Sequence, residues 1–445
     1  MLSVLSERTY RHLFFAQVIA LVGTGLLTVA LGLLAYRIAG ADAGIVLGTA
    51  LAIKMIAYVA VAPVAGALAS RLPRRAFMVA MDLVRAAVAL CLPFVTEVWQ
   101  VYTLVFVLQS ASAAFTPTFQ ATIPDVLPEE KDYTRALSLS RLAYDLENLL
   151  SPTLAAALLT IIDFHWLFAG TFAGFVCSAA LVVSVTLPAT SPDARPGGFY
   201  DKTTRGLRIY LATPRLRGLL ALNLAVAAAG SMVIVNTVVI VRGILGRPEN
   251  DVALALGAFG GGSMLAALLL PRVLDRLHDR GVMLPAAGWL GAVLWGLAAF
   301  LFWRSPISSA TWPILLTTWT LLGVGYSAAQ TPTGRLLKRS ANAVDRPTVF
   351  AAQFALSHAA WLVTYPLAGW LGARAGMPVT LAVLGCITFT GVALAARLWP
   401  ADDGAVEHDH PELPADHPHR QGYGSPHRHE VVIDELHQTW PFVRP

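Results

Sequence analysis

The sequence predicts an all-α membrane protein in which twelve transmembrane helices form two pseudo-symmetric six-helix bundles. Three observations lead to this prediction. First, 56% of the 445 residues are hydrophobic and only 13% are charged, whereas about a quarter of the residues of a soluble protein are charged. Second, apolar stretches of membrane-spanning length recur along the chain. Third, the second half of the chain echoes the first.

Each apolar stretch is about 20 residues or longer, which lets a helix cross a hydrocarbon core of roughly 30 Å. We expect no cleavable signal peptide, because the first stretch is too long and no small-residue cleavage site follows it. The stretches lie at residues 12–36, 44–69, 76–95, 99–123, 137–162, 165–188, 216–241, 251–271, 282–303, 311–334, 347–372 and 377–398.

A polar interruption between the sixth and seventh stretches divides the chain into halves. The halves resemble each other at an offset of about 210 residues: Thr116-Pro117-Thr118 is matched by Thr331-Pro332-Thr333, and Pro152 by Pro366. Such a repeat is typical of transporters that rock two bundles around a site at the membrane midplane. We therefore expect an N-terminal bundle at 1–189, a linker at 190–214, a C-terminal bundle at 215–398 and a tail at 399–445.

Basic residues concentrate in alternate loops. Six arginines and lysines lie between positions 195 and 217 alone, while the other set of loops holds few. By the positive-inside rule the richer loops are cytoplasmic. We therefore expect a multi-pass protein of the inner membrane, surrounded by lipid, with both termini in the cytoplasm. Topology accounts for the net charge of +5, so no nucleic-acid partner is expected.

Cys91, Cys177 and Cys386 lie in separate stretches without paired spacing, so neither a disulfide nor a thiolate metal site is predicted. No phosphate-binding loop pattern is present, so we expect a proton gradient to supply the energy. The chain is expected to be a monomer, to be no enzyme and to hold no cofactor.

Four titratable side chains fall inside the predicted helices: Lys54, Asp145, Glu147 and His358. A charge at the bilayer centre costs at least ~2.5–3.5 kcal/mol, so each of these side chains is expected to have an interaction partner or a functional role. Asp145 and Asn148 are three residues apart and share a helix face, whereas Asp145 and Glu147 lie about 200° apart. One acid is therefore expected to face a cavity, and the other to pair with a neighbouring helix.

These five residues are the predicted transport and coupling residues, and their roles stay open. Carboxylate and imidazole groups can coordinate a divalent metal ion such as Ni, Co or Zn. They can also carry a coupling proton, because burial moves a carboxyl group towards neutral titration and histidine already titrates there. The structural alternative is an ion pair of Lys54 with an acid, and a His358 that is hydrogen-bonded between helices.

The tail contains seven of the eleven histidines of the chain. Its first part, to about residue 426, is rich in Pro, Gly and Asp and is predicted to be disordered. His-x-His spacing lets two imidazoles bind one ion, and nearby acids add oxygen ligands. The end of the tail is more apolar and includes Trp440, so it is expected to dock on the cytoplasmic face. The predicted metal ligands are His408, His410, His417, His419, His427, His429 and His437.

The loop at Gly66–Arg75 resembles the loop between the second and third helices of the major facilitator superfamily. Ser70 and Pro73 replace an acid and a glycine of that pattern. The resemblance implies gating by the arginines of this loop. It also implies a role for Asp82 and Arg85, which look like the Asp-x-x-Arg of siderophore and macrolide exporters; an ion pair that only anchors the helix is the alternative. The predicted gating residues are Arg71, Arg74, Arg75, Asp82 and Arg85.

Within this superfamily, the histidine-rich tail is similar to that of the nickel-resistance efflux branch, and so are Arg141–Pro152 and Phe350–Trp370. This resemblance implies a secondary, proton-coupled exporter of a divalent metal, with nickel or cobalt as the first expectation and the tail as a metal-capturing or sensing element. The first alternative is an exporter of amphipathic drugs or a siderophore, with an incidental tail. A second alternative is a receptor whose tail reports metal to a partner.

Overall fold

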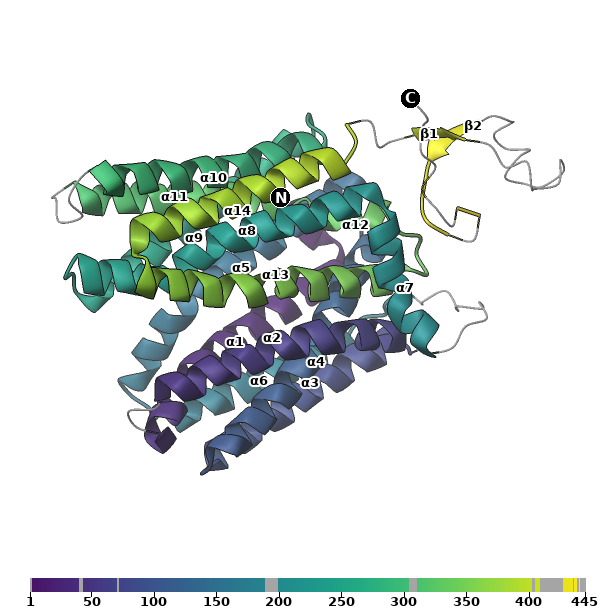
Figure 1. The fold of residues 1–445 in the computed structure, drawn as a ribbon. Helices are drawn as coiled ribbons and strands as arrows, with labels where there is room; N and C mark the ends of the chain where they lie inside the picture. The colour runs from purple at the N-terminus through teal and green to yellow at the C-terminus, as the bar shows by residue number, and fades with distance from the viewer. Residues whose placement is uncertain are drawn as a thin grey trace.

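The computed structural model describes residues 2–39, 43–69, 72–188, 199–303, 310–401, 405–408, 427–434, 436–437 and 440. Within these ranges the chain is helical apart from its connections and one pair of short strands in the tail. The long helices run side by side, and the strand pair lies beyond one end of them (Figure 1).

The first half of the chain folds into six long helices, as predicted. A short 3-10 helix, η1 (Leu2–Ser6), precedes them, and another, η3 (Leu92–Phe94), follows the third. The six are α1 (Arg8–Ala39), α2 (Ala43–Ala69), α3 (Arg74–Cys91), α4 (Val98–Val126), α5 (Glu130–Leu159) and α6 (His165–Val183).

The second half also contains six spans, two of which are extended by a short helix. The first continues as a π-helix, η4 (Val239–Ile244), and the fourth is followed after Pro332 by α12 (Thr333–Arg339). The long helices are α8 (Pro214–Val238), α9 (Glu249–Leu274), α10 (Asp279–Trp303), α11 (Thr311–Gln330), α13 (Arg346–Arg374) and α14 (Met377–Leu398).

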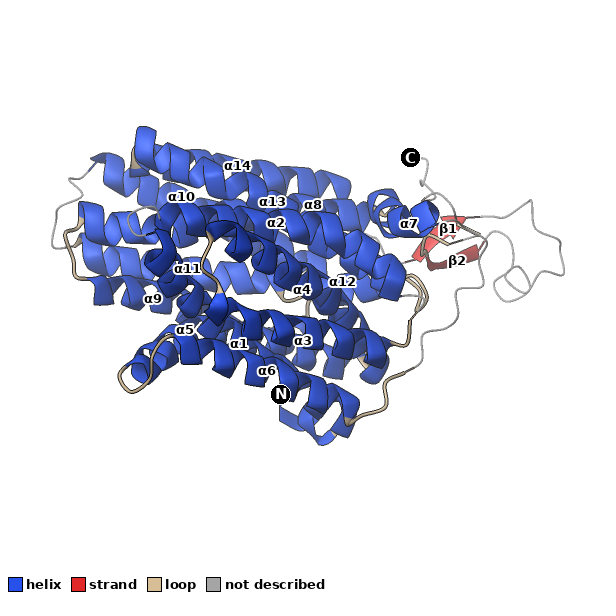
Figure 2. Cartoon of the chain, turned by 90° about the horizontal axis from the view of Figure 1, so that it is seen from below, coloured by secondary structure: helices blue, strands red, loops and turns tan. Residues whose placement is uncertain are grey.

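Helix packing defines two bundles that meet along two seams. In the first bundle α1 packs against α5 and α6, and α3 packs against α4 and α6. In the second, α8 packs against α13 and α14, and α9 against α11. The seams are α2 with α13 and α5 with α9, and both can be followed in Figure 2. A rocking motion of the bundles has to change both seams.

One end of the bundles, which we call the α7 end, carries the linker. Helix α7 (Phe199–Ala212) occupies most of the predicted linker and packs against α13, α2 and α8. The starts of α1, α3, α5, α8, α10 and α13 lie at this end, because successive spans alternate in direction. It is the end that the distribution of basic residues predicts to be cytoplasmic.

Among the described residues, nine helices are long and apolar enough to cross a membrane. The three remaining long helices of the bundles, α5, α11 and α13, are more polar. Two of them, α5 and α13, form the seams, where polar side chains can face protein instead of lipid. The twelve-helix, two-bundle fold is thereby confirmed. The three cysteines are free and lie exposed on the outer surfaces of α3, α6 and α14.

The tail is partly ordered, although disorder was predicted up to about residue 426. Strand β1 (Ala405–His408) pairs antiparallel with β2 (His427–Glu430). The expectation of disorder is therefore wrong for β1, because backbone hydrogen bonding to a distant segment supplies what its local composition does not. The predicted docking of the tail end is confirmed: Val431, Ile433 and Trp440 are buried against the second bundle.

Helices α9 and α11 approach each other closely at two glycines. A Cβ atom on Gly323 would lie 1.9 Å from the carbonyl oxygen of Phe259, and one on Gly262 would lie 2.0 Å from that of Thr320. Small residues let membrane helices pack backbone to backbone in this way.

We predict that Gly323→Ala destabilises the protein by about 1–3 kcal/mol, because backbone atoms of α9 must move. Gly296→Ala is the matched control, since its added Cβ would meet nothing within 4 Å. It should leave stability unchanged or raise it slightly, because a helical glycine costs roughly 0.5–1 kcal/mol relative to alanine. Thermal unfolding in detergent measures both. Equal shifts would contradict the proposed crowding.

Candidate functional site

The titratable residues predicted inside the membrane all lie near the middle of their helices. Lys54 of α2, Asp145 and Glu147 of α5, and His358 of α13 are each within about four residues, or roughly 6 Å, of the midpoint of the helix. Helices α2, α5 and α13 form the two seams between the bundles. The fold thus brings these residues to one level between the two bundles.

Asp145 is held by an arginine of its own helix and lies at the α5–α9 seam. Nη2 of Arg141 donates to Oδ1 of Asp145 at 2.8 Å, and Nε of Arg141 donates to Oγ of Ser263 on α9 at 3.1 Å. The guanidinium also lies 4.7 Å from the ring centroid of Tyr326 on α11. Arg141 therefore links an acid of the first bundle to a hydroxyl and a ring of the second.

Glu147 lies on the other side of α5 and has a different cationic neighbour. Lys54 of α2 lies within electrostatic range of Glu147, but no direct ion pair joins the two among the described residues. The Nζ atom of Lys54 lies 5.6 Å from the ring centroid of Tyr58, which contacts His358. The sequence-based expectation that the two acids diverge agrees with this arrangement. Lys54 was predicted to be the charge partner of an acid, and this stays a prediction; the acid that has a direct ion pair is Asp145, and its partner is Arg141. The side chain of Asn148 lies outside the described residues.

His358 is fixed by its own helix and by rings on both sides of the seam. Its Nδ1 donates to the carbonyl oxygen of Phe354 at 2.7 Å, so Nε2 is the ring nitrogen left to accept a proton or a ligand. The imidazole lies edge-on to Tyr58 of α2, with 4.7 Å between ring centroids, and 4.2 Å from Phe354. This contact joins α2 to α13.

Aromatic side chains surround this level of the molecule. Tyr58 and Phe354 contact each other across the α2–α13 seam with tilted rings, and their centroids are 4.8 Å apart. Further along α13, Trp361 lies 4.9 Å from Tyr365 and 6.4 Å from Tyr326 of α11. Apart from the buried Phe354, these rings are only partly buried. We call the five residues Tyr58, Tyr326, Phe354, Trp361 and Tyr365 the aromatic band.

Metal-ligating side chains do not gather at this level. Across the ranges that the structure describes, no group of three or more His, Cys, Asp or Glu side chains is placed to hold a metal ion. Asp145 is paired with Arg141, while His358 contacts the rings of Tyr58 and Phe354. The structure therefore places the three predicted ligands at one level but not in one coordination sphere.

The α7 end is held closed by ion pairs. Asp125, at the end of α4, binds Arg74 of α3 at 2.6 Å and also Arg346 at the start of α13. One carboxylate therefore joins the two bundles. Arg74 was predicted to be a gating residue and lies in this network; Arg75 is exposed beside it, and Arg71 lies outside the described residues.

The second bundle contains the same arrangement with the charges exchanged. Asp279 of α10 occupies the place of Arg74, and Arg335 that of Asp125, about 210 residues later in the repeat. Arg335 binds Asp279 at 3.2 Å and reaches across to Glu130 of the first bundle. Lys338 donates to the carbonyl oxygen of Pro128 at 2.6 Å. We call the ion pairs Asp125–Arg346 and Arg335–Glu130 the gate.

Asp82 and Arg85 lie away from the gate. They form an ion pair on α3 inside the first bundle, and Ser178 of α6 donates to Asp82 at 2.8 Å. The Arg85 guanidinium lies between Phe115 and Phe175, 4.3 and 4.6 Å from the ring centroids. These neighbours favour the anchoring alternative, because none of them belongs to the second bundle.

Sequence reasoning did not single out Arg141, Asp125, Glu130, Arg335 or Arg346 as site residues. Arg141 had a local signal, since it precedes Asp145 by four residues on a predicted helix and so shares its face. The residues of the gate had no such local signal in the sequence, because Asp125 and Arg346, for example, are 221 positions apart. Only the packing of α4 against α13 brings them together.

The predicted metal ligands of the tail that the structure describes lie in two places, the strand pair and the docked end of the tail. His408 is the register partner of His427, and His429 follows on the same strand. His437 is buried and its Nδ1 lies 3.1 Å from Oδ1 of Asp434. The other predicted ligands, His410, His417 and His419, lie outside the described residues.

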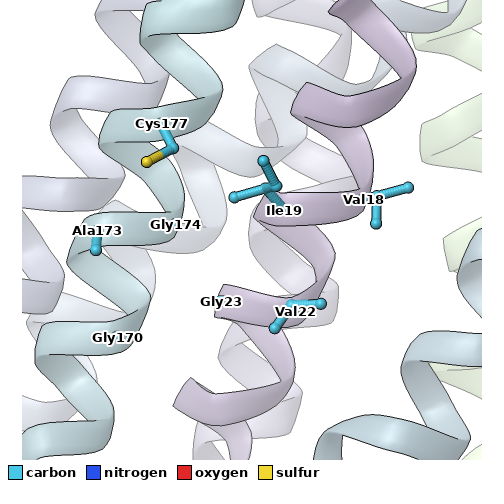
Figure 3. A pocket seen from close by; sticks show the side chains of 8 residues that line it. All are labelled: Val18, Ile19, Val22, Gly23, Gly170, Ala173, Gly174 and Cys177. Carbon is cyan, nitrogen blue, oxygen red and sulfur yellow. The ribbon is translucent and has the colours of Figure 1, made fainter. Parts of the chain in front are cut away.

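A shallow apolar groove of about 290 Å³ lies between α1 and α6 on the outside of the first bundle (Figure 3). Its lining carries no charged side chain, so it offers none of the chemistry of the central residues. The residues that line it are Val18, Ile19, Val22, Gly23, Gly170, Ala173, Gly174 and Cys177.

The sequence matches the Major Facilitator Superfamily over residues 13–288 and 219–432. The chain belongs to this family, and it is a membrane-spanning transporter of the major facilitator fold.

Relatives and solved structures agree with this assignment. The uncharacterized MFS-type transporter YvqJ of Bacillus subtilis is 22% identical over 88% of this chain and 94% of its own. Macrolide efflux protein A of Streptococcus pyogenes is 26% identical over 39% of this chain and 43% of its own. Among solved structures, a bacterial homologue of the iron transporter ferroportin in its outward-facing state has a TM-score of 0.70, with 16% identity over 88% of this chain and 98% of that one. The human organic anion transporter MFSD10 also has a TM-score of 0.70, with 14% identity over 87% of this chain and 99% of that one.

We predict that Asp125→Asn opens the α7 end, because the amide keeps the shape of the carboxylate but loses its charge towards Arg74 and Arg346. The measurement is thiol labelling of a cysteine placed at Thr118, a buried position of α4, in a background without native cysteines. Labelling should become several-fold faster. Asp275→Asn, an exposed acid at the same end, is the control and should leave the rate unchanged. Equal rates in the two variants would refute the role of Asp125.

Proposed function

We propose that this transporter is a proton-coupled exporter of amphipathic organic compounds, with its α7 end in the cytoplasm. The observation that supports it most is the aromatic band at the middle of the helices. Its rings can stack on an apolar or aromatic substrate and attract an amine through their faces. A metal ion would instead need several ligating atoms in one place.

The charges beside the aromatic band suit exchange of a substrate for a proton. Arg141 forms an ion pair with Asp145. Lys54 lies within electrostatic range of Glu147. A substrate amine can compete with Lys54 for Glu147. When a proton neutralises Glu147, the amine loses its counter-charge and is released. Glu147 is thus the proposed coupling residue, because among the described residues it has no direct ion pair like the one that holds Asp145.

The resemblance to macrolide efflux protein A supports the direction and the substrate class of this proposal. In the described state the gate is closed at the α7 end, which is the state expected after substrate has been carried from the cytoplasm. Breaking the gate and rocking the bundles would expose the aromatic band to the cytoplasm again.

The experiment is uptake of erythromycin by inside-out vesicles with an acidic interior. Trp361→Ala should lower uptake at least about tenfold, because it removes a ring from the centre of the aromatic band. Trp370→Ala is the matched control: the residue lies on the same helix but is 61% exposed on its outer surface. It should behave like the unmodified protein.

Glu147→Gln tests the coupling in the same vesicles. Uptake should become insensitive to collapse of the pH gradient, and accumulation against a gradient should disappear. Unmodified protein that accumulated erythromycin equally with and without a pH gradient would exclude proton coupling. No uptake of any amphipathic compound by the unmodified protein would exclude the substrate class.

Export of a divalent metal is the second candidate, and the tail supports it. The backbone register of the strand pair makes His408 the partner of His427, and His-rich segments are typical of sites for nickel or cobalt. In a pump-deficient host, His358→Ala and Asp145→Asn should then each abolish nickel tolerance, while loss of residues 401–445 should only weaken it. Full tolerance in both point variants would refute this candidate. Loss of all tolerance on tail deletion alone would favour a metal receptor.

A further inference from the structure

The end of the tail is folded onto the second bundle at the α7 end. Val431, Ile433 and Trp440 are buried, with exposed fractions of 0%, 7% and 8%. They share one hydrophobic cluster with residues of α7, α8, α12 and α13, and this cluster extends to Ala121 of α4 in the first bundle. The tail end therefore completes a core that touches both bundles.

A local turn keeps the docked segment in shape. Oδ1 of Asp434 accepts hydrogen bonds from the backbone N–H of Leu436 at 2.9 Å and of His437 at 2.8 Å. Burial alone would raise the pKa of Asp434, but these bonds and the His437 side chain outweigh it and lower the pKa to about 2. The turn thus keeps its charge throughout the physiological pH range, and the segment is a defined structural element.

Arg215 connects this segment to the short helix α12. The side chain of Arg215 is fully buried. Its Nη2 donates to the carbonyl oxygen of Val431 at 3.2 Å and to that of Arg339 at 2.8 Å, and its Nε donates to Oγ of Ser340 at 2.8 Å. The ring of Trp440 covers the guanidinium at 5.4 Å. One cation therefore bonds both the tail and the end of α12.

Helix α12 carries the second bundle's half of the gate. Arg335 binds Glu130, and Lys338 binds the carbonyl of Pro128, both in the first bundle. The helix is only seven residues long and is separated from α11 at Pro332, so its orientation depends on its packing. Arg215 and the docked tail hold the C-terminal end of α12, at Arg339 and Ser340, directly after Lys338.

The same cluster holds α7 across the seam. Ile209 and Tyr210 of α7 belong to the cluster that includes the tail. At Gly206, α7 approaches α13 so closely that a Cβ would lie 2.1 Å from the carbonyl oxygen of Thr348. Helix α7 also packs against α2 of the first bundle. Opening of the α7 end must therefore separate α7 from α2 or from α13.

We infer that the described residues of the tail end, above all Val431, Ile433 and Trp440, form an intramolecular latch. The latch docks on Arg215 and holds α7 and α12 in the positions that close the α7 end. Release of the latch leaves Arg215 without the Val431 carbonyl and the Trp440 ring, and it frees α12 to tilt. The population of molecules open at the α7 end then rises. The latch is a property of the conformational cycle and holds for any substrate.

The test is a distance measurement by electron spin resonance between labels at the exposed positions Lys131 and His278, one on each bundle at the α7 end. Serines replace the three native cysteines. Trp440→Ala, or a chain that ends at Glu430, should increase the longer-distance population by at least about threefold relative to the full chain. A chain that ends at Trp440 retains the latch and should match the full chain.

Two further measurements make the result decisive. Trypsin cleavage after Arg428 reports whether the tail has left the bundle, and thermal unfolding reports whether each variant is folded. Arg215→Lys keeps the charge but loses the planar set of donors, and should shift the distances in the same direction as Trp440→Ala. Unchanged distances in a folded variant with a detached tail would overturn the latch. The proposed substrate plays no part in this experiment, so either proposal can fail without the other.

Discussion

The closed state of this transporter depends on Asp125, because its carboxylate binds an arginine of each bundle at once. Arg74 holds it within the first bundle, and Arg346 ties it to the second. The repeat supplies the same link with exchanged charges through Arg335 and Glu130. Partly buried ion pairs are screened less than exposed ones. Both pairs link the two bundles, so rocking of the bundles that opens this end requires both pairs to separate.

The gate and the central residues are coupled through the rigidity of the helices. Helix α5 begins at Glu130 in the gate and carries Arg141, Asp145 and Glu147 at its middle. Helix α13 begins at Arg346 and carries His358. A change in the ion pairs or hydrogen bonds of these central residues therefore acts on α5 and α13, which also carry residues of the gate. Because Arg141 is paired with Asp145 on one of these helices, loss of that pair would leave a buried charge uncompensated unless another group replaced it.

The sequence predicted the transmembrane helices well, but it predicted the ion pairs between side chains poorly. Apolar length alone located the helices of both bundles, since a bilayer sets a fixed minimum for each span. The ion pair of Asp145 with Arg141 could have been predicted from the sequence, because the two residues are four positions apart on one helix. The ion pair of Asp125 with Arg346 could not, because no local pattern signals a contact between helices of different halves. Asp82, given a gating role by resemblance, lies within one bundle.

Hydrophobicity and length are properties of each segment alone, so the sequence was enough to predict twelve membrane-spanning helices, an internal repeat and a tail whose end docks. The tertiary structure decided which acid meets which base, where the aromatic band forms, and that Arg215 receives Val431. These outcomes depend on how helices are rotated and packed, and that is set by the sum of many side-chain contacts between segments far apart in the chain.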